Sequence, residues 1–153
     1  MKWLELKVPP PGVAILVAAS MWSATGIPAG ITERPITVQI AFGLLVLVAG
    51  LLDGTGVLNF LRHHTTINPM APEKSSELVT DGPYRFTRNP MYLGLALLLT
   101  ALTLYLGNPF ALLGPIVFLA YITRFQILPE EQFLLQKFGS SYEDYKSKVR
   151  RWI

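Results

Sequence analysis

Three stretches of the sequence carry no charged side chain, and they constrain the fold more than any other feature. They span residues 8–32, 35–52 and 89–123. A helix that crosses the hydrocarbon core of a bilayer needs about 20 apolar residues, so each stretch can supply at least one such helix. The chain is therefore expected to be an all-α integral membrane protein.

The composition excludes several other classes. Of the 153 residues, 51% are hydrophobic and 15% are charged, whereas soluble domains are about 25% charged. This excludes a soluble enzyme and a disordered tail, and the lack of cysteine excludes a disulfide scaffold. The net charge of +3 arises from basic residues that flank apolar runs. We therefore expect membrane lipids as partners, and no nucleic acid.

The first two stretches are expected to form one membrane-spanning helix each. Residues 13–31 supply the first, and their apolar run is longer than the core of about 7 to 15 residues of a signal peptide. Residues 36–52 supply the second, which can continue past Asp53 to residue 61.

The third stretch is too long for one crossing and predicts a helical hairpin. Gly107, Asn108 and Pro109 interrupt it near its middle. Pro90 suits the first position of one helix, with Asn89 as its cap, and Pro109 opens the next helix in the same way. The prediction is a bundle of about four transmembrane helices in which the last two form the hairpin.

The basic residues indicate the orientation. With four crossings, all of the thirteen lysines and arginines except Arg34 fall on one side. The positive-inside rule places that side in the cytoplasm, together with both termini. The integral membrane protein is thus expected to be multi-pass.

The end of the chain predicts a cytoplasmic amphipathic helix. Gly139 is expected to end the preceding helix, and Ser140 with Glu143 forms a candidate capping box. The apolar face of this last helix consists of Tyr142, Tyr145, Val149 and Trp152. We expect that face to lie at the membrane interface, the alternative being a solvated tail.

Two polar segments are candidate sites. In residues 76–94, a turn at residues 81–83 places Arg85 and Arg88 close to a helix N-terminus, an arrangement suited to a carboxylate or phosphate ligand. The alternative is that both arginines anchor the helix to lipid phosphates.

The second segment follows the last span. Arg124 precedes Glu130 and Glu131 by about two helical turns, with Pro129 expected to bend the helix between them. The paired glutamates suit a cation or a hydroxyl-rich ligand, while Arg124 alone is explained by snorkelling to the interface.

Other polar features of the sequence give weaker indications of a functional site. The glycines of residues 50–56 suit helix packing, and Asp53 suits a helix end or a pocket. His63 and His64 lack a third ligand at a useful spacing, so no metal site is expected.

Together, these segments resemble a known family. LVTDGPYRFTRNPMYLG (residues 78–94), EE (130–131) and FGSSYEDYKSKVRRW (138–152) occur in the order found in the isoprenylcysteine carboxyl methyltransferase and phospholipid methyltransferase group. The upstream TTINP (65–69) is similar to looser bacterial variants.

The resemblance implies one membrane methyltransferase-like domain over residues 1–153, in a prokaryotic inner membrane. A cytoplasmic loop (62–89) and tail (124–153) would contribute a site for S-adenosylmethionine. The methyl group would pass to a lipophilic or membrane-accessible acceptor, with a carboxylate, a lipid amine and a small thiol all open.

The resemblance also implies site residues. Cofactor contacts would come from Ser76, Glu77, Leu78, Val79, Tyr84, Arg88, Asn89, Pro90, Met91, Tyr92 and Glu130. Arg124 and Glu131 would be catalytic. Two positions depart from the isoprenylcysteine enzymes: Asn89 replaces a histidine, and Gln126 replaces an arginine thought to hold the substrate carboxylate, for which Arg124 is the candidate substitute.

Two alternatives to a methyltransferase remain at this stage. One is an NADPH-dependent membrane reductase of the sterol reductase type, for which the chain is short. The other is a non-catalytic membrane module.

Overall fold

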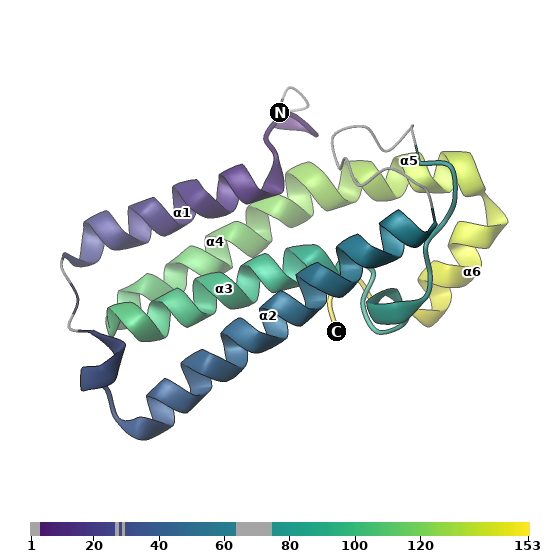
Figure 1. Ribbon diagram of the computed structural model, residues 1–153. Helices are drawn as coiled ribbons and strands as arrows, with labels where there is room; N and C mark the ends of the chain where they lie inside the picture. The colour runs from purple at the N-terminus through teal and green to yellow at the C-terminus, as the bar shows by residue number, and fades with distance from the viewer. Residues whose placement is uncertain (1–3, 27, 29, 64–74) are drawn as a thin grey trace.

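The computed structural model describes residues 4–26, 28, 30–63 and 75–153 (Figure 1). The expected all-α class is confirmed for this part of the chain, which contains no strand. The helices are α1 (Pro10–Thr25), α2 (Ile36–Arg62), α3 (Pro90–Leu106), α4 (Leu113–Ile122), α5 (Leu128–Phe138) and α6 (Ser140–Lys148). Single 3-10 turns occupy Ile31–Glu33, Gly82–Arg85 and Pro109–Leu112.

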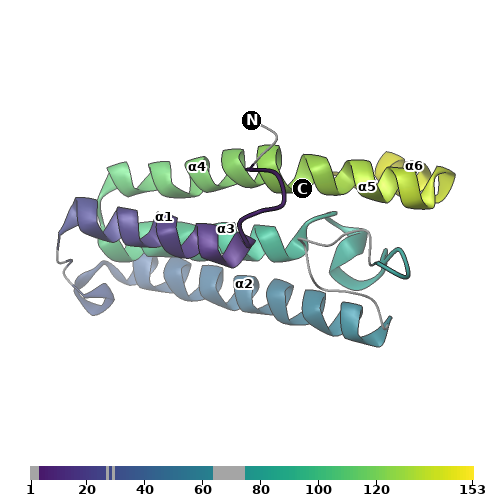
Figure 2. The same cartoon turned by 90° about the horizontal axis from the view of Figure 1, so that it is seen from above.

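Helix α3 lies at the centre and contacts α1, α2 and α4, which run alongside it (Figures 1 and 2). Its buried side chains, among them Leu99, share an apolar core with Phe118 and Ile122 of α4. In a membrane, such packing stabilises the helices chiefly through van der Waals contact, because lipid is as apolar as these side chains. The position of α3 matters for function because its first turn belongs to the candidate site.

Small residues allow α2 and α3 to approach closely. A Cβ atom on Gly56 would lie 2.8 Å from Met91 Cγ, and Gly94 lies directly against the Asp53 carboxyl group. The packing role expected for the glycines holds at Gly56 but not at Gly50 or Gly54, where nothing lies within 4 Å of an added Cβ.

Asp53 is neither at a helix end nor in the pocket described below. It lies within α2, facing α3, because α2 continues without a break to Arg62. The extension of the second helix to residue 61 is therefore confirmed.

The break predicted in the third stretch is also confirmed. Pro90 begins α3, and Gly107 ends it in the left-handed conformation with φ of 65°. Asn108 accepts a hydrogen bond from the backbone of Phe110, and Pro109 begins the next helix. Glycine and proline occur at these positions because the turn needs a positive φ and the first helical turn needs no N–H donor.

Around Pro129 the helix changes its pitch. A π-helical turn at Thr123–Ile127 joins α4 to α5. Proline cannot donate to the carbonyl four residues earlier, which is that of Phe125. The backbone of Leu6 donates to this oxygen instead, at 3.1 Å, so the N-terminal segment compensates for the proline.

Within the described residues, two helices are long and apolar enough to cross a membrane. They are α2 and the continuous helix Pro109–Phe138, which contains α4 and α5. Only 6% of the apolar window of α2 is buried inside the protein, which distinguishes α2 from the core helix of a soluble domain. These helices agree with a membrane protein, while a bundle of four crossings stays a prediction.

Arg34 stabilises the end of the hairpin. Its Nη2 donates to the carbonyl oxygens of Leu106, at 3.1 Å, and of Tyr105, at 3.5 Å. The guanidinium lies against Gly107, where a side chain would collide with it. The cation thus meets the last carbonyls of α3, which carry the negative end of the helix dipole.

We expect Arg34→Gln to lower the free energy of unfolding by about 1–2 kcal/mol, because the carbonyls lose a charged donor. Thermal unfolding in detergent would measure the change. Arg62→Gln is the matched control, since Arg62 is an exposed arginine at the end of α2. Equal destabilisation by the two variants would contradict the capping role.

Candidate functional site

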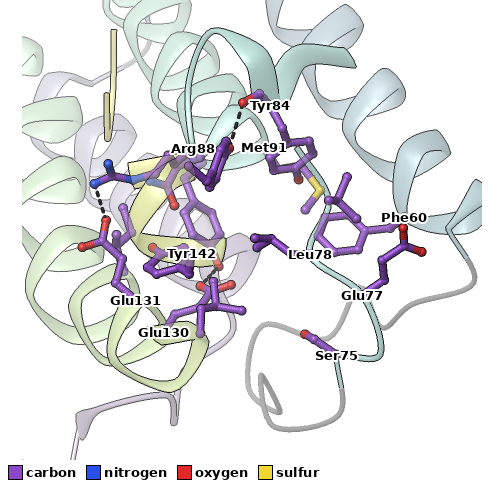
Figure 3. Close-up of a pocket in the computed structure, with 16 residues that line it drawn as sticks. Phe60, Ser75, Glu77, Leu78, Tyr84, Arg88, Met91, Glu130, Glu131 and Tyr142 are labelled. Atoms are coloured by element: carbon purple, nitrogen blue, oxygen red, sulfur yellow. Dashed lines mark hydrogen bonds and ion pairs between the residues drawn. The ribbon is translucent and has the colours of Figure 1, made fainter. Parts of the chain in front are cut away.

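A pocket opens where the end of α2, the start of α3, α5 and α6 meet. Of the residues predicted for the site, it is lined by Glu77, Leu78, Val79, Tyr84, Arg88, Asn89, Met91, Tyr92, Glu130 and Glu131. Phe60, Ser75, Ile127, Leu134, Tyr142 and Tyr145 complete the lining. Figure 3 shows Arg88 and Glu131 on one side of the pocket, and Phe60 and Glu77 on the other.

The turn before α3 is held against α2 by specific contacts. Asn59 Nδ2 donates to the backbone oxygen of Asp81 at 3.0 Å. Gly82 has a φ of 55° and lies directly on the Asn59 amide, so a side chain there would be both strained and blocked. The turn places Tyr84 beside Phe60. The two rings pack edge to face, with their centroids 5.5 Å apart.

A buried carboxylate joins the two predicted segments. Glu131 Oε1 accepts a hydrogen bond from Arg88 Nη2 at 2.8 Å. Arg151 donates to the same carboxylate through Nε, to Oε1 at 3.0 Å, and through Nη2, to Oε2 at 2.8 Å. Glu131 is 8% exposed, and the two guanidinium groups compensate for its loss of solvent.

Arg88 is tied to the end of the chain as well. Its Nη1 donates to the backbone oxygens of Val149, at 2.7 Å, and Lys146, at 3.2 Å. Its Nε is buried without a hydrogen-bond partner. Three of the five N–H donors of the guanidinium are therefore occupied within the protein.

Glu130 has different surroundings from its neighbour. Tyr92 donates its hydroxyl hydrogen to Glu130 Oε2 at 2.9 Å, and Gln126 also hydrogen-bonds to Glu130. Both partners are neutral. Gln126, which is 2% exposed, thus lies beside the carboxylate that faces the pocket.

Helix α6 supplies a wall of two tyrosines. Tyr142 and Tyr145 are buried, and desolvation raises the pKa of each hydroxyl above its usual range. Tyr145 donates to the backbone oxygen of Tyr84 at 2.8 Å. These rings pack against the pocket, so the prediction that they face the membrane interface is wrong.

Neither of two predicted caps makes a side-chain capping hydrogen bond, although Asn89 is the N-cap residue of α3 as predicted. The N-cap residue of α6 is Gly139, so Ser140 lies one position too far along the helix and its side chain gives no cap. Asn89 precedes α3, but its Nδ2 donates to the backbone oxygen of Arg151 at 2.9 Å. At Asn89 a tertiary contact replaced the local one.

Three predicted site residues lie outside the pocket lining: Ser76, Pro90 and Arg124. Arg124 is exposed and pairs with Glu5, its Nη1 lying 2.9 Å from Oε1. The residues 64–74, which include His64 and the TTINP segment, lie outside the described part of the chain.

Sequence reasoning missed several residues of the site. Arg151 looked like one of a group of basic tail residues, and Tyr142 and Tyr145 looked like an interfacial face. Phe60 lies in α2 after its charge-free residues, and its apolar side chain gives no indication of a functional site. Only the spatial arrangement brings these residues to the pocket.

Comparison with known proteins assigns the chain to a family. Residues 38–141 match the model of the phospholipid methyltransferase family. The chain belongs to that family. No solved structure matches it significantly.

Several curated proteins are similar to this family member. Protein-S-isoprenylcysteine O-methyltransferase B of Arabidopsis thaliana is 31% identical over 112 residues, 71% of this chain and 55% of that protein. The Schizosaccharomyces pombe protein-S-isoprenylcysteine O-methyltransferase is 35% identical over 79 residues, 50% of this chain and 32% of that protein. The chain thus spans about half or less of the length of these relatives.

A bacterial protein is similar over a shorter region. An uncharacterized protein of Haemophilus influenzae is 56% identical over 63 residues, which is 41% of this chain and all of that protein.

A histidine tethers the site to the end of α2. His63 Nδ1 lies 3.1 Å from Glu77 Oε1, and Nε2 lies 3.1 Å from Asp81 Oδ1. The hydrogen bond with Glu77 contributes most to raising the pKa of His63, and Asp81 adds to it. The protonated histidine therefore joins two acidic residues of the segment that borders the pocket.

We expect this tether to make stability depend on pH. Since the folded-state pKa is raised, the contribution of His63 is complete below about pH 6.5 and is lost as pH rises through the folded value. Wild type should melt above His63→Gln at about pH 5.5, and the difference should shrink by about pH 8.5. A difference that is the same at both pH values would contradict this.

Proposed function

We propose that the chain binds S-adenosylmethionine in this pocket and transfers its methyl group to an acceptor that reaches the site from the membrane. One observation carries the proposal: in a member of the phospholipid methyltransferase family, the arginine-bearing turn before α3 and the twin acids of α5 enclose a common pocket. Its walls offer a cation, carboxylates and aromatic rings, which are the groups that such a cofactor needs.

The residues present fit the chemistry of the cofactor. Its ammonium and ribose hydroxyls suit Glu130, whose partners in the protein are neutral. Its carboxylate suits the guanidinium of Arg88, which lines the pocket next to the N-terminus of α3. Its sulfonium suits the aromatic faces of Tyr84 and Tyr92.

The pocket is narrow. Its volume is about 80 Å³, whereas pockets for small molecules hold about 300–1,000 Å³. We infer that the segment bearing Ser75, Glu77, Leu78 and Val79, which forms one wall of the pocket, moves outward to admit a ligand.

The two glutamates would have different tasks. Glu131 is fixed by two guanidinium groups, so we assign it to holding the site together. Glu130 remains available to a ligand. S-adenosylmethionine supplies an electrophilic methyl group, so the protein needs chiefly to align donor and acceptor and to exclude water.

The acceptor is proposed to be lipophilic. The named relatives are isoprenylcysteine O-methyltransferases, and the apolar surface of α2 suits contact with lipid. A carboxylate, a lipid amine and a small thiol remain candidate acceptors. The basic residues near the site further suggest that it faces the cytoplasm.

Binding of S-adenosylhomocysteine tests the cofactor. We expect Glu130→Gln to raise the Kd at least about tenfold, because a carboxylate that binds a cation or hydroxyls becomes neutral. Calorimetry on the detergent-solubilised chain would measure the Kd. Glu143→Gln, on the exposed side of α6, should leave it unchanged. Binding of NADPH in place of S-adenosylhomocysteine would favour the reductase alternative.

Transfer of a labelled methyl group tests the reaction. With labelled S-adenosylmethionine and a total lipid extract, wild type should label a lipophilic product, and Glu130→Gln should reduce the initial rate at least about tenfold at low cofactor concentration. Cofactor binding without any labelled product would point to the non-catalytic alternative.

A further inference from the structure

The last residues of the chain lie across the start of α3. Three consecutive backbone oxygens at the C-terminus accept hydrogen bonds from residues 87–89. Val149 accepts from the Arg88 side chain at 2.7 Å, and Arg150 accepts from the Arg88 backbone at 3.0 Å. Arg151 accepts from Thr87 Oγ1 at 3.1 Å and from Asn89 Nδ2 at 2.9 Å.

The Arg151 side chain adds a separate link. Its two donors bind both oxygens of Glu131, whereas Arg88 binds Oε1. Two arginines from distant parts of the sequence therefore share one buried carboxylate. Bidentate pairing of this kind fixes the orientation of a carboxylate as well as its position.

We propose that Arg151 is a positioning residue of the cofactor pocket: it orients the Glu131 carboxylate, which in turn holds the Arg88 guanidinium in the pocket wall. The proposal rests on the proposed function. It adds a residue near the C-terminus to the site, whereas the last of the predicted site residues is Glu131.

Arg88 alone cannot give Glu131 the same geometry. Without Arg151, Oε2 loses its guanidinium partner inside the protein. A buried carboxylate oxygen without a partner favours rotation toward water or another donor. Glu131 would then no longer fix Arg88 Nη2, and the guanidinium in the pocket wall would keep its Nη1 bonds to the backbone oxygens of Val149 and Lys146.

The side chain of Arg151 can be removed without detaching the tail. The backbone bonds to residues 87–89 do not depend on it, and Trp152 packs against the apolar core. Arg151→Gln should therefore keep the chain folded while it removes the charged link. Arg150→Gln is the matched control, because that side chain is exposed and the substitution keeps its backbone bond.

The test compares these variants in the full chain in detergent. We expect Arg151→Gln to raise the Kd for S-adenosylhomocysteine about tenfold, and Arg150→Gln to leave it within about twofold. Added methylguanidinium should restore part of the affinity of Arg151→Ala, since it can occupy the vacated position beside Glu131. A residue that only stabilised the fold would not respond in this way.

Two results would overturn the proposal. One is a folded Arg151→Gln protein with wild-type affinity, whatever its melting temperature. The other is an affinity loss in Arg151→Ala that methylguanidinium leaves unchanged.

Hydrogen exchange separates this proposal from the proposed function. If wild type does not bind S-adenosylhomocysteine, the proposed function fails. The positioning role is then decided by amide exchange over residues 87–92, which should be faster in Arg151→Gln than in Arg150→Gln. Equal exchange in the two variants would overturn it.

Discussion

The buried Glu131 carboxylate determines how the functional end of the molecule is assembled. Removing a carboxylate from water costs several kcal/mol unless cations and hydrogen bonds compensate. Here Arg88 comes from the turn before α3, Glu131 from α5 and Arg151 from the C-terminus. Satisfying one charge therefore requires three segments, distant in sequence, to meet beside the pocket. The tail also closes over the start of α3 through its backbone oxygens.

The adjacent acids show how one helix can serve structure and ligand binding at once. Consecutive residues of a helix point about 100° apart. Glu131 therefore faces the two guanidinium groups, whereas Glu130 faces Tyr92 and Gln126 at the pocket. The identical side chains differ in their partners, and the partners decide which carboxylate remains available. The π-helical turn just before Pro129 helps to set this rotation of α5 relative to α4.

Local sequence signals predicted much of the framework. Pro90, the break at residues 107–109 and the extension of α2 past Asp53 were placed correctly, because proline, glycine and apolar length act through the nearest few residues. The same reasoning failed for the cap at Ser140 and for the face of α6. Periodicity identifies an apolar face, but it does not identify what covers that face, and here Tyr142 and Tyr145 cover the pocket.

By itself, the sequence determined the helical class, the apolar lengths and the two polar segments, since these follow from composition and short-range backbone chemistry. The tertiary structure alone decided which charges pair. Arg124, a predicted site residue, pairs with Glu5 at the surface, and Arg151, one basic residue among several in the tail, reaches Glu131. A buried carboxylate selects its partners by geometry and desolvation, and both depend on segments that are far apart along the chain.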